Sequence, residues 1–389
     1  MYKICVAIGT RPEAIKLLPV VKELRALPQE LSCTVLATGQ HRELADQVFA
    51  AFGIEPDSDL DLMQPGQDLA GFMGRAVPAL RDAFARDWPD LVLVEGDTTT
   101  VFAAALSAFW LGIKVGHVEA GLRSGDRRNP FPEEMNRILT GCLADLHFAP
   151  TEQAAVNLRA EGVDSSRIFV TGNTVVDALR EVARIADPPP GVPSRPGARL
   201  ILATVHRRES FGEPLRSIAR AFEEIVRRAP DVELALPVHP NPEVRGVMRS
   251  ALAGRERIHL LDPLPYVPFV GLMKASTLVL TDSGGVQEEA PALGKPVLVL
   301  RVTTERPEGV RYGVARLVGT DTDRIVAETL RLLSDREAYL QMARAVSPYG
   351  DGQAARRIVQ AVRYHFGLTE KPPASFAPQP GGVSGGGDS

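Results

Sequence analysis

The sequence predicts an α/β protein with two doubly wound domains, each a parallel sheet covered by helices on both faces. Short apolar runs alternate with segments of helical periodicity, and the runs are apolar throughout, as strands buried on both faces require. Residues 187–197 contain five prolines and two glycines, which can continue neither a helix nor a central strand. A chain of 389 residues is also long enough for two hydrophobic cores.

The first half of the chain begins with an apolar run that ends in a polar turn, followed by a helical segment. Strands are expected at residues 4–8, 35–37, 91–94, 115–118, 147–149 and 168–170. Helices are expected at residues 13–27, 69–86 and 98–110. Three more are expected: one that ends at residue 52, one that starts at residue 133, and one between the last two strands. Pro78 predicts a kink or a break in its helix, and residues 57–67 are expected to form a loop.

After the proline-rich segment the same alternation restarts. Strands are expected at residues 200–203, 232–236, 258–261, 278–281 and 297–300, and helices at 215–228, 243–252, 267–274, 321–333, 336–345 and 353–366. The predicted organisation is an N-terminal domain over residues 1–186, a linker over 187–197, a C-terminal domain over 198–350, a terminal helix over 351–368 and a disordered tail over 369–389.

Composition excludes several classes of function. A formal net charge of -4 provides no general attraction to nucleic acid or to an anionic membrane. The N-terminal apolar run is too short for a secretory signal and no run is long enough to span a membrane, so a cytoplasmic location is expected. The three cysteines are scattered and no HExxH motif is present, which gives no support to a metal site. The turn after the first strand lacks the GxGxxG pattern, so no cofactor is expected.

Polar residues follow many of the predicted strands, and in doubly wound folds ligands bind at this edge of the sheet. The first domain supplies Arg11, Lys16, Asp97, Glu119 and Glu133, and the second supplies His206, Arg207, His239, Ser283, Glu289 and Arg306. Two such domains would face each other across a cleft. Cations and a glycine turn suit a pyrophosphate, whereas carboxylates suit proton transfer or sugar hydroxyls.

Residues 282–289 resemble a strand end, a glycine turn and a helix start. Gly284 and Gly285 would let backbone N–H groups approach an anion at the positive end of the helix. Individual polar residues also have purely structural explanations. Asp97 suits the N-cap position of its helix and Glu133 the first turn of the next one, for example. The number of such residues at separate strand ends favours a binding site.

The chain resembles the non-hydrolysing UDP-N-acetylglucosamine 2-epimerases of bacteria, which have the two-domain GT-B architecture. The resemblance runs from about Lys3 to His365 and rests on motifs that occur in order along the chain. They are Gly9-Thr10-Arg11-Pro12-Glu13-Ala14-Ile15-Lys16, Gln40-His41-Arg42, Gly96-Asp97-Thr98-Thr99-Thr100, His117-Val118-Glu119-Ala120-Gly121-Leu122-Arg123, Pro132-Glu133-Glu134, Thr171-Gly172-Asn173-Thr174, His206-Arg207-Arg208-Glu209, Asp282-Ser283-Gly284-Gly285 and Thr304-Glu305-Arg306-Pro307-Glu308.

The resemblance implies reversible conversion of UDP-GlcNAc to UDP-ManNAc, in which UDP is eliminated to leave a bound 2-acetamidoglucal and then adds back. The product would supply ManNAc units for surface polysaccharides. Residues matching the family's catalytic positions are Asp97, Glu119, Glu133 and His206. Residues matching its substrate contacts are Arg11, Lys16, Phe269 at the uracil, Ser283, Gly284, Gly285, Glu289 at the ribose, and Arg306.

Some members of this family bind a second UDP-GlcNAc as an activator, and Gln40, Gln67, Arg207 and His239 fit that pattern, although they would also suit the catalytic cleft. The family commonly forms homodimers. One departure from the family is Glu95, where a His or Gln is frequent; if its side chain faces Asp97, like-charge repulsion raises the pKa of Asp97. The alternatives are a GT-B glycosyltransferase that uses a UDP-sugar, a hydrolysing epimerase that releases ManNAc, and a non-catalytic nucleotide-sugar sensor.

Overall fold

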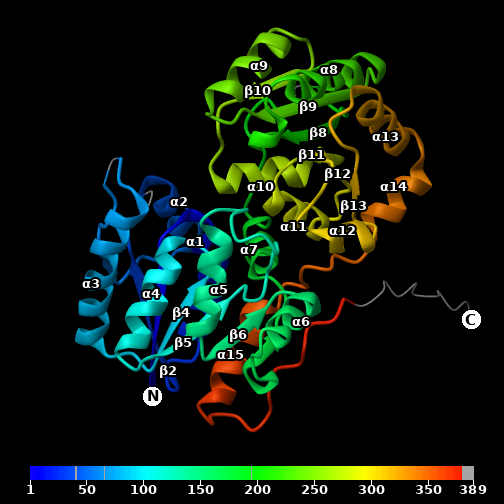
Figure 1. Cartoon of the computed structure of the whole chain (residues 1–389). Helices are drawn as coiled ribbons and strands as arrows, with labels where there is room; N and C mark the ends of the chain where they lie inside the picture. The colour runs from blue at the N-terminus through cyan, green and yellow to red at the C-terminus, as the bar shows by residue number, and fades with distance from the viewer. Residues whose placement is uncertain (40–41, 65, 194, 379–389) are drawn as a thin grey trace, which may run out of the picture. The chain divides into compact units, whose positions relative to one another are not determined.

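The computed structural model describes residues 1–39, 42–64, 66–193 and 195–378, and for residues 42–45 only the backbone. The chain divides into two compact units. Unit 1 consists of Met1–Ala178 and Tyr349–Ala377, and unit 2 of Leu179–Pro348, with Pro378 as its last described residue. The strands of each unit are flanked by helices (Figure 1). The predicted fold class, two doubly wound parallel α/β sheets, is confirmed.

Unit 1 is built on a parallel sheet with the strand order β3-β2-β1-β4-β5-β6-β7. Its strands are β1 (Tyr2–Ile8), β2 (Leu31–Ala37), β3 (Ser58–Asp59), β4 (Leu91–Glu95), β5 (Lys114–Val118), β6 (Leu146–Ala149) and β7 (Ile168–Val170). The strand order reverses between β1 and β4, whose register pairs Ile4 with Leu91. A doubly wound sheet opens a crevice at such a reversal, beyond the carboxyl ends of the strands.

The helices of unit 1 are α1 (Arg11–Arg25), α2 (Arg42–Phe52), α3 (Leu69–Asp87), α4 (Thr99–Trp110), α5 (Glu133–Leu143), α6 (Glu152–Ala160), the start of α7 (Thr174–Val182), and α15 (Ala354–His365). Pro78 does not end α3, so the expectation of a break is wrong. Buried residues lie on both sides of the proline, Phe72 and Ala76 before it and Leu80 and Phe84 after it, and their packing holds the helix together.

Unit 2 contains a second parallel sheet, with the order β10-β9-β8-β11-β12-β13. Its strands are β8 (Arg199–Thr204), β9 (Val232–Pro237), β10 (Ile258–Leu261), β11 (Leu278–Thr281), β12 (Val297–Val299) and β13 (Ala315–Leu317). Its helices are α8 (Glu213–Arg228), α9 (Pro242–Leu252), α10 (Tyr266–Ala275), α11 (Gly284–Ala292), α12 (Pro307–Arg311), α13 (Thr322–Ser334) and α14 (Arg336–Ala343). Here the order reverses between β8 and β11, where Thr204 lies beside Thr281.

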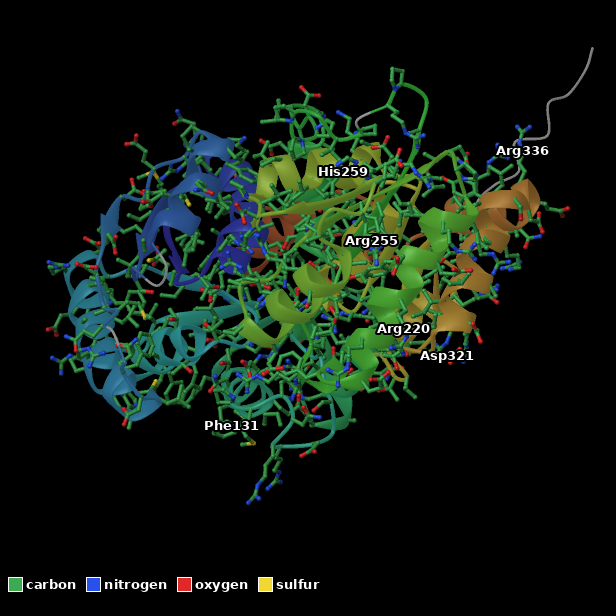
Figure 2. All side chains as sticks on the ribbon, turned by 90° about the horizontal axis from the view of Figure 1, so that it is seen from above. Phe131, Arg220, Arg255, His259, Asp321 and Arg336 are labelled. Atoms are coloured by element: carbon green, nitrogen blue, oxygen red, sulfur yellow. The ribbon has the colours of Figure 1, made fainter. Side chains whose placement is uncertain are left out.

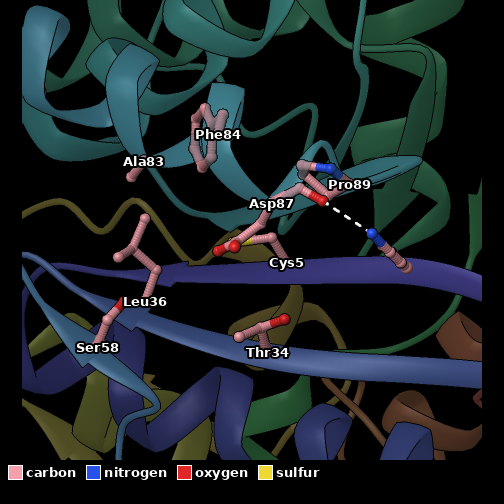
Figure 3. Close-up of a pocket in the computed structure, with 9 residues that line it drawn as sticks. Cys5, Thr34, Leu36, Ser58, Ala83, Phe84, Asp87 and Pro89 are labelled. Carbon is pink, nitrogen blue, oxygen red and sulfur yellow. Dashed lines mark hydrogen bonds between the residues drawn. The ribbon is translucent and has the colours of Figure 1, made fainter.

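A small cavity lies beneath α3 in unit 1 (Figure 3). Its volume is about 20 Å³, enough for one water molecule. Side chains from β1, β2 and α3 line it, among them Cys5, whose pKa burial raises to about 12, so the thiol stays protonated. Beside it, the Nζ of Lys3 donates to the carbonyl oxygen of Asp87 at 3.1 Å. None of the predicted ligand-binding residues lines this cavity.

Residues 369–377 of the expected tail belong to unit 1. Residues 369–378 form no helix or strand, but the backbone N–H of Phe376 donates to the carbonyl oxygen of Val170 at 2.7 Å. The ring of Phe376 is buried in an apolar cluster that includes Val170 and Leu158. The expectation of disorder is therefore wrong for Phe376. Within the described ranges, no helix has the length and hydropathy needed to cross a membrane.

Candidate active site

A cluster at the carboxyl edge of the unit 1 sheet joins one lysine to two carboxylates. Glu95 is the last residue of β4, and Glu119 follows the adjacent strand β5. Lys16 comes from α1, and its Nζ lies 2.9 Å from Oε1 of Glu95 and 2.5 Å from Oε2 of Glu119. Asn173 donates its side-chain amide to the same oxygen of Glu119 at 2.9 Å. The structure therefore brings together the predicted residues Lys16 and Glu119, and adds Glu95 and Asn173.

The backbone of Glu119 is in the left-handed region, with φ at +61°. This conformation costs a residue other than glycine about 1–2 kcal/mol, and such strain concentrates at functional sites. Two residues later, Gly121 has φ at +88°, and a Cβ there would meet the carbonyl oxygen of Ala154 at 2.3 Å. The turn that presents Glu119 is thus fixed by close packing against α6.

Asp97 lies in the turn after β4 and forms an ion pair with Arg137 of α5. Arg137 also binds the carboxylate of Glu134 at 3.0 Å, and the side-chain amide of Asn136 donates to the carbonyl oxygen of Asp97 at 3.0 Å. The helix-capping explanation of Asp97 is wrong, because Thr98 is the N-cap of α4. The side chain of Glu95 contacts Lys16, which also binds Glu119, and the side chain of Asp97 contacts α5.

Glu133 is the first residue of α5 and is half-buried. Within the part of the chain that the structure describes, its carboxylate makes no hydrogen bond and no ion pair. Its neighbour Glu134 is only 1% exposed and accepts from the backbone N–H groups of Ser124 and Gly125 at 3.0 and 3.2 Å. Glu134 therefore fixes the loop before α5. That loop presents the ring of Phe131 to solvent, with 68% of the residue exposed (Figure 2).

Arg11 opens α1 directly after β1, at a turn held by the buried carboxylate of Glu13. Glu13 accepts from the backbone N–H of Gly9 at 2.7 Å and from the hydroxyl groups of Thr10 and Thr98 at 2.9 and 2.8 Å. Burial raises the pKa of Glu13 to about 7. Glu13 thus ties the turn of Arg11 to the turn of Asp97. The sequence signal for it is the Thr-x-x-Glu spacing of a helix N-terminus.

In unit 2, Asp282 and His206 meet at the carboxyl ends of β11 and β8. Asp282 is fully buried, and its Oδ1 lies 3.0 Å from Nδ1 of His206. Its other oxygen accepts from the backbone N–H groups of His206 and Arg207 at 2.9 and 2.8 Å. A carboxylate on Nδ1 keeps the proton there and presents Nε2 to a ligand. The ring of His239 stacks on that of His206, with the centroids 5.6 Å apart.

The glycine turn opens α11, as expected. Ser283 is the N-cap residue, and its side chain makes no capping hydrogen bond. A Cβ on Gly285 would meet nothing within 4 Å, and one on Gly284 would meet Nη2 of Arg207 at 3.5 Å. Gly285 is exposed and Gly284 is buried, and beside them lies Arg207, whose Nη2 is 3.3 Å from a carboxylate oxygen of Glu305. This arrangement suits a phosphate.

Glu289 lies further along α11 and is 7% exposed. Its Oε1 accepts from the hydroxyl group of Tyr266 at 3.0 Å. Phe269 is half-buried on the same helix as Tyr266 and packs against the core. Arg306 forms an ion pair with Glu288, a partner that the sequence does not reveal.

The four residues of the expected second ligand site are spread over the chain. Gln40 lies outside the described residues. Gln67 belongs to unit 1, where its side-chain oxygen accepts from the backbone N–H of Gln64 at 3.2 Å and from Arg75. Arg207 and His239 both lie next to His206 in unit 2. Across the described residues, no group of three or more His, Cys, Asp or Glu side chains could hold a metal ion.

Comparison with known proteins identifies the family of this chain. Residues 22–363 match the family described as UDP-N-acetylglucosamine 2-epimerase. A protein of that name from Bacillus subtilis is 49% identical, over 96% of this chain and 98% of the relative.

Solved structures of proteins with the same family name have a similar fold. A putative UDP-N-acetylglucosamine 2-epimerase from Listeria monocytogenes superposes with a TM-score of 0.92 at 48% identity, covering 97% of this chain and 99% of that one. A UDP-GlcNAc 2-epimerase from Neisseria meningitidis, solved bound to UDP-GlcNAc, gives a TM-score of 0.84 at 43% identity, covering 92% and 99%. Because the family match and these likenesses span nearly the whole chain, this protein belongs to the UDP-N-acetylglucosamine 2-epimerase family.

Proposed function

We propose that this protein interconverts UDP-GlcNAc and UDP-ManNAc without hydrolysis, by eliminating UDP to a bound 2-acetamidoglucal and adding it back. The observation that carries the proposal is the set of carboxylates in unit 1. Asp97 is paired with Arg137, Glu119 is bound to Lys16, and Glu133 is held by no described partner. Inverting carbon 2 requires acid/base groups on both faces of the sugar ring, and these three carboxylates are chemically suited to that work.

In the first step, a carboxylate takes the proton from carbon 2 while the bond between carbon 1 and the diphosphate oxygen breaks. The electron pair of the C–H bond becomes the double bond between carbons 1 and 2, and UDP leaves with the electron pair of the C–O bond. In the second step, a carboxylic acid protonates carbon 2 from the other face as UDP attacks carbon 1. Asp97, Glu119 and Glu133 are the acid/base candidates.

Unit 2 serves the nucleotide in this proposal. Ser283, Gly284 and Gly285, at the start of α11, are assigned to the negative diphosphate both as part of the substrate and as leaving group. His206 presents Nε2 to it because Asp282 occupies Nδ1. Glu289, steadied by Tyr266, is assigned to the ribose hydroxyls, and Phe269 to the uracil. Arg11 and Arg306 are assigned to the substrate, in line with the UDP-GlcNAc bound by the relative from Neisseria meningitidis.

The location of the protein, its oligomeric state and the use of its product are also part of the proposal. A cytoplasmic homodimer would make UDP-ManNAc for surface polysaccharides, without a cofactor. A second molecule of UDP-GlcNAc would bind at Gln40, Gln67, Arg207 and His239.

Proton and phosphorus NMR of the protein with UDP-GlcNAc tests the proposal. We expect UDP-ManNAc to accumulate to an equilibrium ratio, with no free ManNAc and no UDP beyond the amount of enzyme. Free ManNAc with stoichiometric UDP would instead show a hydrolysing epimerase. Tight binding of UDP-GlcNAc without turnover would indicate a sensor. The variant Asp97→Asn, which should retain binding and lose turnover, is the control for a contaminating activity.

A further inference from the structure

Glu95 is a buried carboxylate at the candidate site to which the proposed chemistry assigns no role. It ends β4 and is 2% exposed. Its Oε1 lies 2.9 Å from Nζ of Lys16, and the same nitrogen lies 2.5 Å from Oε2 of Glu119. The oxygens of Glu95 and Glu119 therefore contact one ammonium group from two sides.

Two ionised carboxylates around one partly buried ammonium group would not be electrically balanced. If both were ionised, the three groups would carry a net negative charge in a place where little water can screen it, because Glu95 and Glu119 are 2% and 8% exposed and Lys16 is 16% exposed. One added proton makes the group neutral. Two carboxylates that share a site behave in this way, with the first proton bound more tightly than the second.

Resting on the proposed function, we propose that Glu95 is a positioning residue that sets the protonation state of Glu119, because the two carboxylates hold one proton between them around Lys16. With the shared proton on Glu95, the carboxylate of Glu119 carries no proton and can take one from carbon 2, which brings the pair to two protons. Return of one proton to the sugar restores the pair with its single shared proton, and no other reactant is needed.

The surroundings support this assignment. Burial raises the pKa of Glu95 well above its usual range; Lys16 opposes that effect, and Glu119 and Glu13 add to it. From β5, His117 also faces Glu119, but burial lowers its pKa to about 4, so the imidazole is neutral near pH 7. Asn173 adds a neutral donor to Glu119 at 2.9 Å. Lys16 is thus a cation that both carboxylates contact, and Glu95 reaches Glu119 through it.

Carboxyl carbon-13 NMR of the full chain, with glutamate labelled at Cδ, measures this coupling without any turnover. The signal of Glu119 is assigned by its loss in Glu119→Gln. We expect Glu119 in the wild type to titrate in two steps shared with Glu95. In Glu95→Gln, which keeps the size and an acceptor oxygen for Lys16, Glu119 should titrate in one step, with its midpoint lower by about one pH unit because a like charge is gone.

The matched control is Glu152→Gln, which removes a carboxylate that is 66% exposed on α6 of the same unit and should leave the midpoint of Glu119 unchanged. Midpoints of Glu119 that coincide in the wild type and Glu95→Gln would overturn the proposal. If Glu95→Gln does not fold, the titration of the wild type decides on its own. A Glu119 signal that titrates in a single step, independent of Glu95, would also overturn the proposal.

A kinetic readout separates this proposal from the proposed function. The pH profile of kcat/KM with UDP-GlcNAc should move to lower pH in Glu95→Gln and stay in place in Glu152→Gln. A merely structural role for Glu95 would lower the rate at every pH without moving the profile, which would contradict the proposal. A wild type that does not epimerise would refute the proposed function, whereas the NMR titration would still report whether Glu95 and Glu119 are coupled.

Discussion

The Nδ1 of His206 lies 3.0 Å from a carboxylate oxygen of Asp282, a residue with no exposed surface. The same carboxylate accepts the backbone N–H groups of His206 and Arg207. One buried side chain therefore fixes the position of the loop after β8, the orientation of the imidazole and the nitrogen that carries its proton. Such a carboxylate–histidine pair suits a histidine that must present Nε2 to a charged leaving group.

Replacing Asp282 with Asn should lower kcat about 100-fold or more, because an amide cannot hold the proton on Nδ1 as a carboxylate does. Steady-state kinetics of Asp282→Asn, His206→Asn and the double variant test this. If the two residues act as one unit, the double variant should be no slower than His206→Asn. Losses that multiply in the double variant would show that Asp282 acts independently of His206.

Glu133 and Glu134 are adjacent in sequence, but the same substitution should affect catalysis at Glu133 and stability at Glu134. Glu133→Gln should reduce kcat about 100-fold, as expected for an acid/base group, and change the free energy of unfolding by less than about 0.5 kcal/mol. Glu134→Gln should destabilise unit 1 by about 1.5–3 kcal/mol, since it weakens charged hydrogen bonds to Arg137 and to the loop N–H groups. Urea unfolding and initial rates of both variants give the answer. Equal effects of the two substitutions on stability and rate would refute this division of roles.

His147 should make the protein less stable in mild acid. Burial, with smaller effects of His117 and Arg167, lowers the pKa of His147 from 6.5 to about 3. Between these values the unfolded chain binds a proton that the folded chain does not, so stability falls as the pH drops below 6.5. Between pH 7.0 and 5.5 this residue should contribute a loss of about 1 kcal/mol.

The variant His147→Phe keeps a ring at this position and cannot titrate. Urea unfolding at the two pH values should show a smaller pH dependence for this variant than for the wild type. The same loss of stability in both proteins would show that other groups are responsible.

Tyr266 should affect binding of the nucleotide and leave the chemical step alone. Its hydroxyl group donates to Glu289 at 3.0 Å in a buried setting. Tyr266→Phe removes the hydroxyl group that binds Glu289, so the KM for UDP-GlcNAc should rise about 3- to 10-fold at constant kcat. Glu289→Gln should behave similarly. A fall in kcat with an unchanged KM would place Glu289 in the chemistry.

The fold was predictable because its strands are short runs of apolar residues, such as residues 91–94, and such runs between helices are typical of a buried parallel sheet. Short elements could not be predicted. For example, β13 contains three residues and α12 five, and both depend on packing against their neighbours. Residues at strand ends, such as Asp97 and Glu119, could be located from chain order alone. Their partners could not, because Arg137 and Lys16 come from helices whose orientation follows from packing. Asp282 was visible at a strand end, but its partner became evident only from the pairing of β8 with β11.

The incorporation of deuterium at carbon 2 tests the central claim, that the protein breaks and remakes the C–H bond of UDP-GlcNAc, most directly. The wild type is incubated with UDP-GlcNAc in deuterated water without an acceptor, and the sugars are analysed by NMR and mass spectrometry. The account predicts that UDP-ManNAc appears and that both nucleotide sugars carry one deuterium at carbon 2. Recovery of unlabelled UDP-GlcNAc, with no UDP-ManNAc formed, would contradict it.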